Sequence, residues 1–232
     1  ARLAQGWTAL LVTLPWLLLA ALSLWRWKVL RWPLGAAFDP VRLPLQCVIF
    51  AVLALAWLFG LTLAGDATPL PWLPLLNPAE LAQWVSLLLI ARWLYDAQGP
   101  APLQRLRVPV LAVAGFIALT STVLHGVHHW GGVVWDPTMA RFSLAQTSLT
   151  VLWSVLGVIA WVWGSRRGQR VLWMVGAVLM AVVLAKLVLV DRQHLGNLLG
   201  IASFIAYGLL CTVVGYLAPA PPSAPPTVEE NQ

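Results

Sequence analysis

The residue types and spacing of a chemical site occur at three histidines near the middle of the chain: His125, His128 and His129. Counted from Ser121, they stand at positions i+4, i+7 and i+8, which places them on one face of a helix. Together with Asp136 they offer the ligands that zinc and other divalent ions accept. The alternative is that they cap the helix and hydrogen-bond to loops or headgroups, because no recognised metal spacing such as His-Glu-x-x-His is present. A b-type haem is less favoured, since only His125 lies deep enough in the helix.

A second set of residues has the character needed to bind an anionic group. Arg141, Lys186 and Arg192 supply positive charge, and two tryptophans supply a stacking or headgroup surface. Lys186 falls inside an apolar segment, where a lysine is either functional or extends to pair with an acid such as Asp191. Besides the histidines above, the predicted binding residues are Trp130, Trp135, Arg141, Lys186, Asp191, Arg192 and His194.

These residues must be positioned by membrane helices, because the composition is too apolar for a soluble globule. Hydrophobic residues make up 60% of the 232-residue chain and charged residues only 9%. A spanning helix needs about 20 mostly apolar residues, and runs of that length without alternating polarity exclude a membrane barrel. The sequence predicts an all-α, polytopic transmembrane helical bundle of about seven spans: 7–25, 43–64, 79–95, 108–127, 142–163, 171–190 and 198–217.

The segments predict two transmembrane halves and a tail. The first half covers residues 1–107 and contains three spans, and the second half covers 108–217 and contains four. A proline-rich linker over residues 99–109 separates the two halves. Residues 218–232 are rich in proline and then acidic, which predicts a disordered tail.

Local patterns predict how several helices begin and pack. Asn77 and Glu80 predict a capping box in which the Glu80 carboxylate reaches back to the cap, and Ser143 with Gln146 predicts another. Small residues spaced four apart predict that the last two helices form a closely packed pair. These small residues are Ala177, Ala181, Ala185, Gly196, Gly200, Gly208 and Thr212.

The distribution of charge predicts the orientation in the membrane. The net charge of +6 does not indicate nucleic-acid binding, because basic residues of multi-pass proteins gather in cytoplasmic loops. Most arginines and lysines follow the first, third and fifth spans, so these loops and the C-terminus are expected in the cytoplasm. The histidines are then expected outside it. Cys47 and Cys211 lie inside apolar segments and are expected to be reduced.

Four motifs between about Val123 and Pro222 are similar to those of a known family. They are HHWGGVVWD, SLAQTSLTVLWSVLGV, RVLWMVGAVLMAVVLAKLVLVD and GIASFIAYGLLCTVVGYLAPAPP. In them the chain resembles a bacterial family of predicted membrane proteins, domain of unknown function 2339. The resemblance implies a long inner-membrane protein with this segment at its C-terminus, so the chain, which begins Ala-Arg-Leu, is expected to be part of something longer. It implies no catalytic residues. Arg192 departs from the family pattern and could compete for Asp191.

Three hypotheses about function remain open. The first is a non-enzymatic inner-membrane module that supports envelope transport or assembly and binds a lipid headgroup, polymer or partner on its extracytoplasmic, periplasmic face. The second is a membrane-embedded enzyme with a histidine as general base or metal ligand, oriented by Asp136 or Asp191. The third is a purely structural part of a longer membrane protein. The expected partners are membrane lipids and other membrane helices or the remainder of a longer chain, with no nucleic acid.

Overall fold

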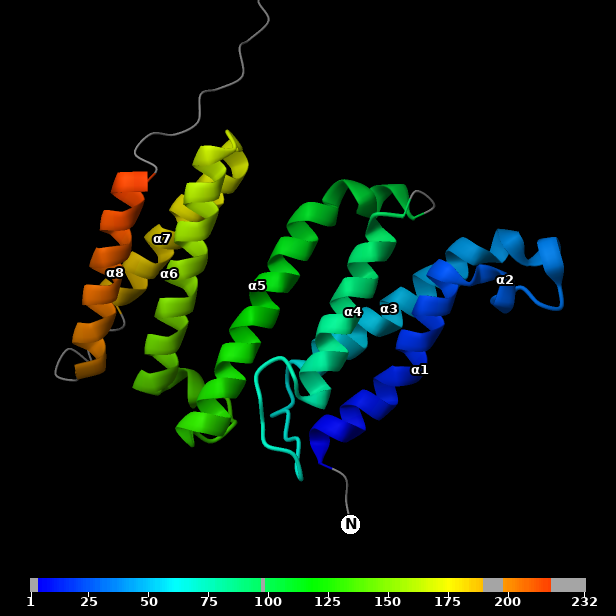
Figure 1. The fold of residues 1–232 in the computed structure, drawn as a ribbon, viewed down its shortest axis with the longest axis horizontal. Helices are drawn as coiled ribbons and strands as arrows, with labels where there is room; N and C mark the ends of the chain where they lie inside the picture. Colours follow the sequence, from blue (N-terminus) through cyan, green and yellow to red (C-terminus); the bar gives the residue numbers. More distant parts are fainter. Residues whose placement is uncertain (1–3, 97–98, 190–197, 218–232) are drawn as a thin grey trace, which may run out of the picture. The chain divides into compact units, whose positions relative to one another are not determined.

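The computed structural model describes residues 4–96, 99–189 and 198–217, and the regular elements in these ranges are all helical. The chain divides into two compact units, residues 1–130 and 131–232, and each is described by itself. In Figure 1 the helices of the first unit run from blue to green and those of the second from yellow-green to red. The all-α fold class predicted from the composition is confirmed.

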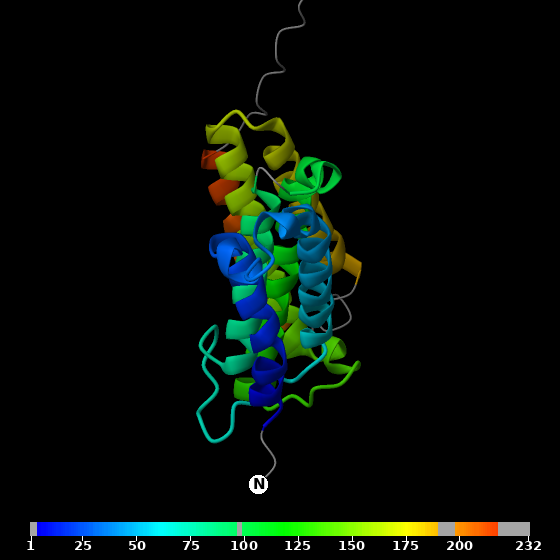
Figure 2. The ribbon, with the colours of Figure 1, turned by 90° about the vertical axis from the view of Figure 1, so that its right-hand side faces the viewer.

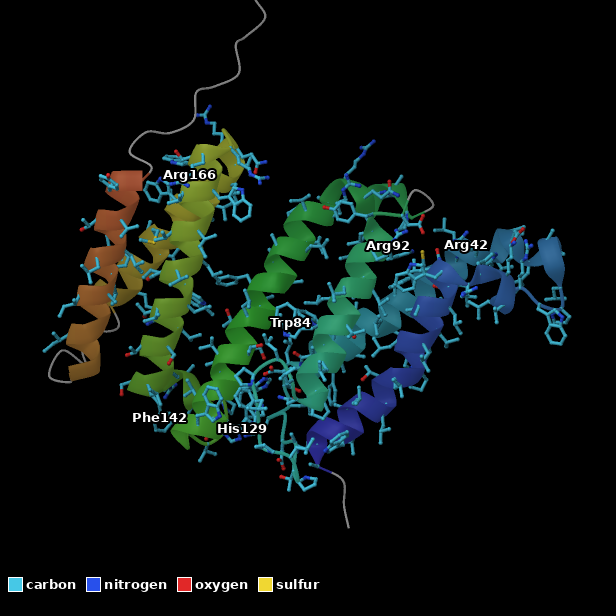
Figure 3. The ribbon with its side chains drawn as sticks, in the orientation of Figure 1. Arg42, Trp84, Arg92, His129, Phe142 and Arg166 are labelled. Carbon is cyan, nitrogen blue, oxygen red and sulfur yellow. The ribbon has the colours of Figure 1, made fainter. Side chains whose placement is uncertain are left out.

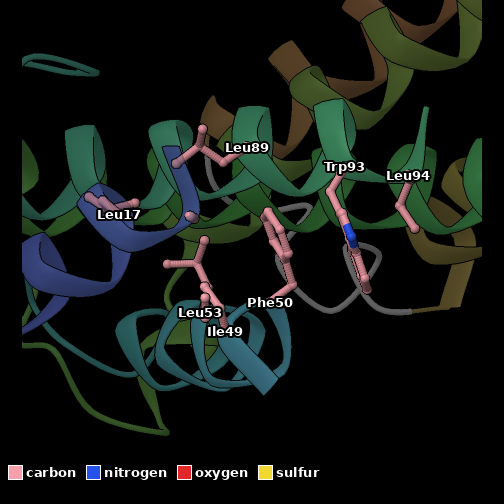
Figure 4. Close-up of a cluster of buried hydrophobic side chains, with 8 residues drawn as sticks. Leu17, Ile49, Phe50, Leu53, Leu89, Trp93 and Leu94 are labelled. Atoms are coloured by element: carbon pink, nitrogen blue, oxygen red, sulfur yellow. The ribbon is translucent and has the colours of Figure 1, made fainter. Parts of the chain in front are cut away.

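The first unit is a bundle of apolar helices around a core of leucines and aromatic rings. Its elements are α1 (Gln5–Trp25), α2 (Trp27–Leu30), η1 (Gly35–Val41), α3 (Arg42–Gly60), α4 (Pro78–Leu94) and α5 (Ala101–Gly131). Helix α1 packs against both α3 and α4, and Phe50 of α3 stacks on Trp93 of α4 with ring centroids 4.5 Å apart (Figure 4). Ala118 of α5 joins a smaller cluster with Trp57 and Leu87, which attaches α5 to the same bundle.

The second unit is organised around α6 (Ser143–Arg166), which follows the short helix η2 (Met139–Arg141). It packs against α7 (Arg170–Leu189) and α8 (Leu198–Leu217). Glycines allow α6 and α7 to approach closely, because a Cβ at Gly164 or Gly176 would overlap the backbone of the facing helix.

The predicted close pairing of α7 with α8 through small residues is wrong among the residues that the structure describes. Ala181 and Ala185 are exposed, and a Cβ added at Gly208 would meet nothing within 4 Å. The tight contact instead joins α6 to α7, and Gly157 of α6 takes part in it beside Met180. A four-residue spacing shows that a helix has a small-residue face, but not which neighbour that face meets.

The membrane spans agree with the sequence prediction in place and only partly in number. Five described segments are long and apolar enough to cross a membrane: Gln5–Trp25, Gly35–Gly60, Ala101–Gly131, Ser143–Arg166 and Arg170–Leu187. Helices α4, with 17 residues, and α8, with 20, coincide with the other two predicted spans, and the count of seven stays a prediction. The predicted linker is helical from Ala101 onward, so a boundary at residue 107 falls within α5. The tail over 218–232 lies outside the described residues.

Candidate functional site

One end of the first unit brings together the buried polar side chains of Asn77, Glu80 and His125, and we call it the histidine end. It is formed by the N-termini of α1 and α4, the C-terminus of α5 and the loop over residues 61–77, which all meet there (Figures 1 and 2). Figure 3 shows His129 at this end and Arg42 and Arg92 at the opposite end of the same unit. The chemistry predicted from the histidines must therefore be judged together with this loop.

The loop over residues 61–77 is attached to the start of α1. Gly6 N donates to Asp66 O at 2.8 Å, and a Cβ on Gly6 would lie only 2.5 Å from that oxygen. Trp7 Nε1 donates to Ala67 O at 3.3 Å. The Asp66 carboxylate accepts from the hydroxyl and the backbone N–H of Thr68, and the hydroxyl bond is the main reason that the pKa of Asp66 lies below its usual value. A helix start and a self-bonded turn thus fix this side of the loop.

Helix α5 holds the other side of the loop through two of the predicted histidines. His125 Nε2 donates to Leu63 O at 2.9 Å, and His129 Nε2 donates to Ala64 O at 2.8 Å. Both nitrogens must carry a hydrogen, since a carbonyl oxygen can only accept. Trp72 of the loop stacks on the His129 ring with centroids 4.9 Å apart and meets Trp130 edge-on at 5.2 Å. Because the two histidines lie on one face of α5, both side chains reach the loop and bind its backbone carbonyls.

Glu80 completes the arrangement from the start of α4. The Asn77 side chain accepts from Ala79 N and Glu80 N, as the predicted N-cap requires. The Glu80 carboxylate does not reach back to the cap, however, and this part of the prediction is wrong. It accepts from Leu75 N at 2.5 Å through Oε2 and lies 3.1 Å from His125 Nδ1 through Oε1. Glu80 is a site residue that the capping pattern concealed.

The contact between Glu80 Oε1 and His125 Nδ1 requires a proton between these two atoms. Leu63 O requires the hydrogen of neutral His125 at Nε2, which leaves Nδ1 with a lone pair. An ionised Glu80 would then oppose lone pair to lone pair at 3.1 Å, so the proton lies either on Glu80 or on an imidazolium. In both cases the pair is neutral overall, which suits side chains that are 0% and 1% exposed.

The arrangement favours a structural role for His125 over catalysis. Both ring nitrogens are bonded and the side chain is buried, whereas a general base must reach a substrate proton. His128 meets the His129 ring edge-on at 4.6 Å. In the part of the chain that the structure describes, no group of three or more histidine, cysteine or acidic side chains is placed to hold a metal ion.

The remaining predicted residues belong to the second unit, apart from Trp130, which is an exposed ring at the end of α5. Asp136 accepts from the Thr138 hydroxyl and backbone N–H, and the hydroxyl bond is the main cause that lowers the pKa of its carboxyl. Trp135 is half-buried and Arg141 is exposed in η2. Asp191, Arg192 and His194 lie outside the described residues, so their predicted grouping with Lys186 stays a prediction.

Lys186 of α7 is bonded to the first turns of α6. Its Nζ donates to Gln146 O at 3.0 Å and to Thr150 Oγ1 at 2.6 Å. The capping box predicted for Ser143 and Gln146 is wrong: Phe142 is the N-cap residue without a side-chain bond, and Gln146 Nε2 donates to Ala140 O. The lysine thus contributes to the packing of α6 on α7.

The comparisons with known proteins place the chain without giving it an activity. A family model described as "Predicted membrane protein (DUF2339)" matches residues 1–221, a wider stretch than the resemblance recognised from Val123 onward. No curated protein and no solved structure matches the chain.

Proposed function

We propose, from the premise that the chain belongs to the DUF2339 family of predicted membrane proteins, that it is a non-enzymatic module with a binding surface at the histidine end. Its location is a membrane that it crosses several times. The proposed role is to support transport or assembly in the cell envelope by holding a partner outside the cytoplasm.

The observation that carries the proposal is an apolar loop that hydrogen bonds from three helices hold in an exposed position. Four leucines within seven residues are 46–67% exposed: Leu70, Leu73, Leu75 and Leu76. A contiguous group of exposed apolar residues is typical of a protein interaction site or a membrane contact. Because the exposed residues are leucines, they favour an apolar partner surface over a charged polymer.

The distribution of basic residues supports the proposed orientation. Arg26, Lys28 and Arg31 lie beyond α1, and Arg42 and Arg92 lie at the end of the first unit opposite His129 (Figure 3). In the second unit, Arg166 lies at the end opposite Phe142. Since basic residues are retained in the cytoplasm, we infer that the histidine end faces the periplasm of a bacterial inner membrane.

Site-specific photo-cross-linking in intact cells tests the proposal. A benzophenone amino acid at Leu76, in the loop, is compared with one at Leu55, which is equally exposed in the middle of α3. We expect a discrete cross-linked protein from position 76 and only lipid adducts from position 55. The same adducts from both positions would show that the loop contacts nothing but lipid.

A further inference from the structure

We propose that a cavity between α1, α3 and α4 binds the ester-linked part of a membrane glycerolipid. The cavity has a volume of about 230 Å³ and lies on the α3 side of the α1–α4 contact. Its lining is uncharged and mostly apolar. Its polar side chains are the exposed Gln5 and Thr8 and the buried Thr13 of α1, and Gln83 and Ser86 of α4. An uncharged lining excludes an ionised headgroup from the cavity itself, but it accepts an acyl chain and a neutral polar group.

Gln83 supplies the hydrogen-bond donor that an ester carbonyl would meet. Its side chain is only 7% exposed, and within the described residues its Nε2 has no hydrogen-bond partner. The hydroxyls of Thr13 and Ser86 are already bonded to the backbone carbonyls of their own helices. A buried amide donor without a partner is costly unless a ligand or water binds it, so the cavity requires an acceptor.

The backbone of α3 makes room for this donor. Gly60 also lines the cavity, and a Cβ there would lie 3.0 Å from Gln83 Nε2. Trp57 of the same helix lines the cavity too, and its buried indole Nε1 has no partner among the described residues. Two unbonded N–H groups beside an apolar space favour a ligand with carbonyl oxygens over a pure hydrocarbon.

The depth and the opening of the cavity favour a glycerolipid. Gln83 is five residues into α4, which places it about 7 Å along the axis from the helix start. The polar layer on each side of the hydrocarbon core is about 5–8 Å thick. With the start of α4 at the outer edge of that layer, the amide would lie at its inner edge, at the level of lipid ester groups. Val12 and Phe59 of the lining are 70% and 67% exposed, which opens the cavity sideways toward lipid.

Native mass spectrometry of the purified full chain tests this binding with two matched lipids. They are dioleoyl phosphatidylglycerol and its diether analogue, which has the same headgroup and chain length but no ester carbonyl. We expect the wild-type protein to retain the ester lipid about fivefold better, as one hydrogen bond provides. Equal retention of the two lipids by the wild-type protein would overturn the proposal, and so would stronger retention of an isoprenoid quinone than of either lipid.

Two variants locate the preference. Gln83→Met keeps the volume and removes the donor, so the ester preference should disappear. Gln169→Met makes the same change at an exposed position between α6 and α7 and should leave the preference intact. A preference that survives Gln83→Met would place the lipid elsewhere. The cavity meets the loop over residues 61–77 only at Leu63, and none of the four exposed leucines lines it, so this result is independent of the cross-linking result.

Discussion

The Glu80–His125 pair allows a quantitative prediction about how the loop over residues 61–77 is held. Glu80→Leu and His125→Leu each remove the 3.1 Å contact between the two side chains. Glu80→Leu also leaves Leu75 N without its partner, and His125→Leu leaves Leu63 O without its partner. Glu80→Gln is the matched control, because its amide can accept from Leu75 N and donate to the lone pair on His125 Nδ1.

The expected magnitude follows from burial and from the number of bonds lost. Each leucine variant loses two hydrogen bonds in a fully buried site, one of them to a group that can be charged, which we expect to lower the free energy of unfolding by about 3 kcal/mol. Glu80→Gln retains both bonds and should lower it by less than about 1 kcal/mol. Because the two leucine variants remove the same contact, their effects should be non-additive by about 2 kcal/mol.

Unfolding by sodium dodecyl sulfate in mixed micelles, followed by tryptophan fluorescence, measures these differences. A loss of about 3 kcal/mol corresponds to a change of roughly 150-fold in the unfolding equilibrium. Neutral interhelical hydrogen bonds in membrane proteins couple by about 0.6 kcal/mol on average. A coupling at or below that value, or a Glu80→Gln variant as unstable as Glu80→Leu, would refute the argument that one proton is held between the two residues.

Two further predictions concern the loop and the second unit. The pKa of Asp66 is lowered in the folded protein. The contribution of its carboxylate to loop stability is therefore present above the ordinary pKa of about 4 and is lost as the pH falls through the lower folded pKa. Hydrogen exchange of the loop should show this small loss in the wild type and not in Asp66→Ala. Gly176→Ala should lower the free energy of unfolding of the second unit by about 1–3 kcal/mol because its Cβ would overlap Trp161. Gly208→Ala is the control and should change this free energy little. Thermal unfolding compares the two variants, and equal stability would contradict the packing of α6 on α7.

The sequence predicts the helical fold because the bilayer leaves few alternatives. Apolar runs of about 20 residues can be satisfied only as helices in lipid, so their existence is readable from composition. Packing partners are harder to predict, as the small residues of α7 and α8 illustrate. Their spacing describes one helix at a time, and it was Gly157, Gly164 and Gly176 that met the facing helix.

Sequence patterns single out His125 and His129 at this end, but they give neither the bonds of these side chains nor the part that Glu80 plays. The spacing of His125 and His129 correctly indicates a shared face, but the partners of both are backbone carbonyls at Leu63 and Ala64, about 60 residues away. A carbonyl has no signature in the sequence. Glu80 matched a capping pattern, and the local interpretation hid its long-range contact with His125.

The bonding of the histidine end also bears on why polar groups are retained there. Gly6, Glu80 and His125 belong to three helices, and each bonds to the loop over residues 61–77, whose last residue, Asn77, caps α4. In a membrane protein an unbonded loop backbone near lipid is unstable, so a loop that presents leucines outward must have its peptide groups satisfied from within. The buried polar cluster and the exposed apolar loop are therefore two consequences of one requirement, and loss of the first should disorder the second.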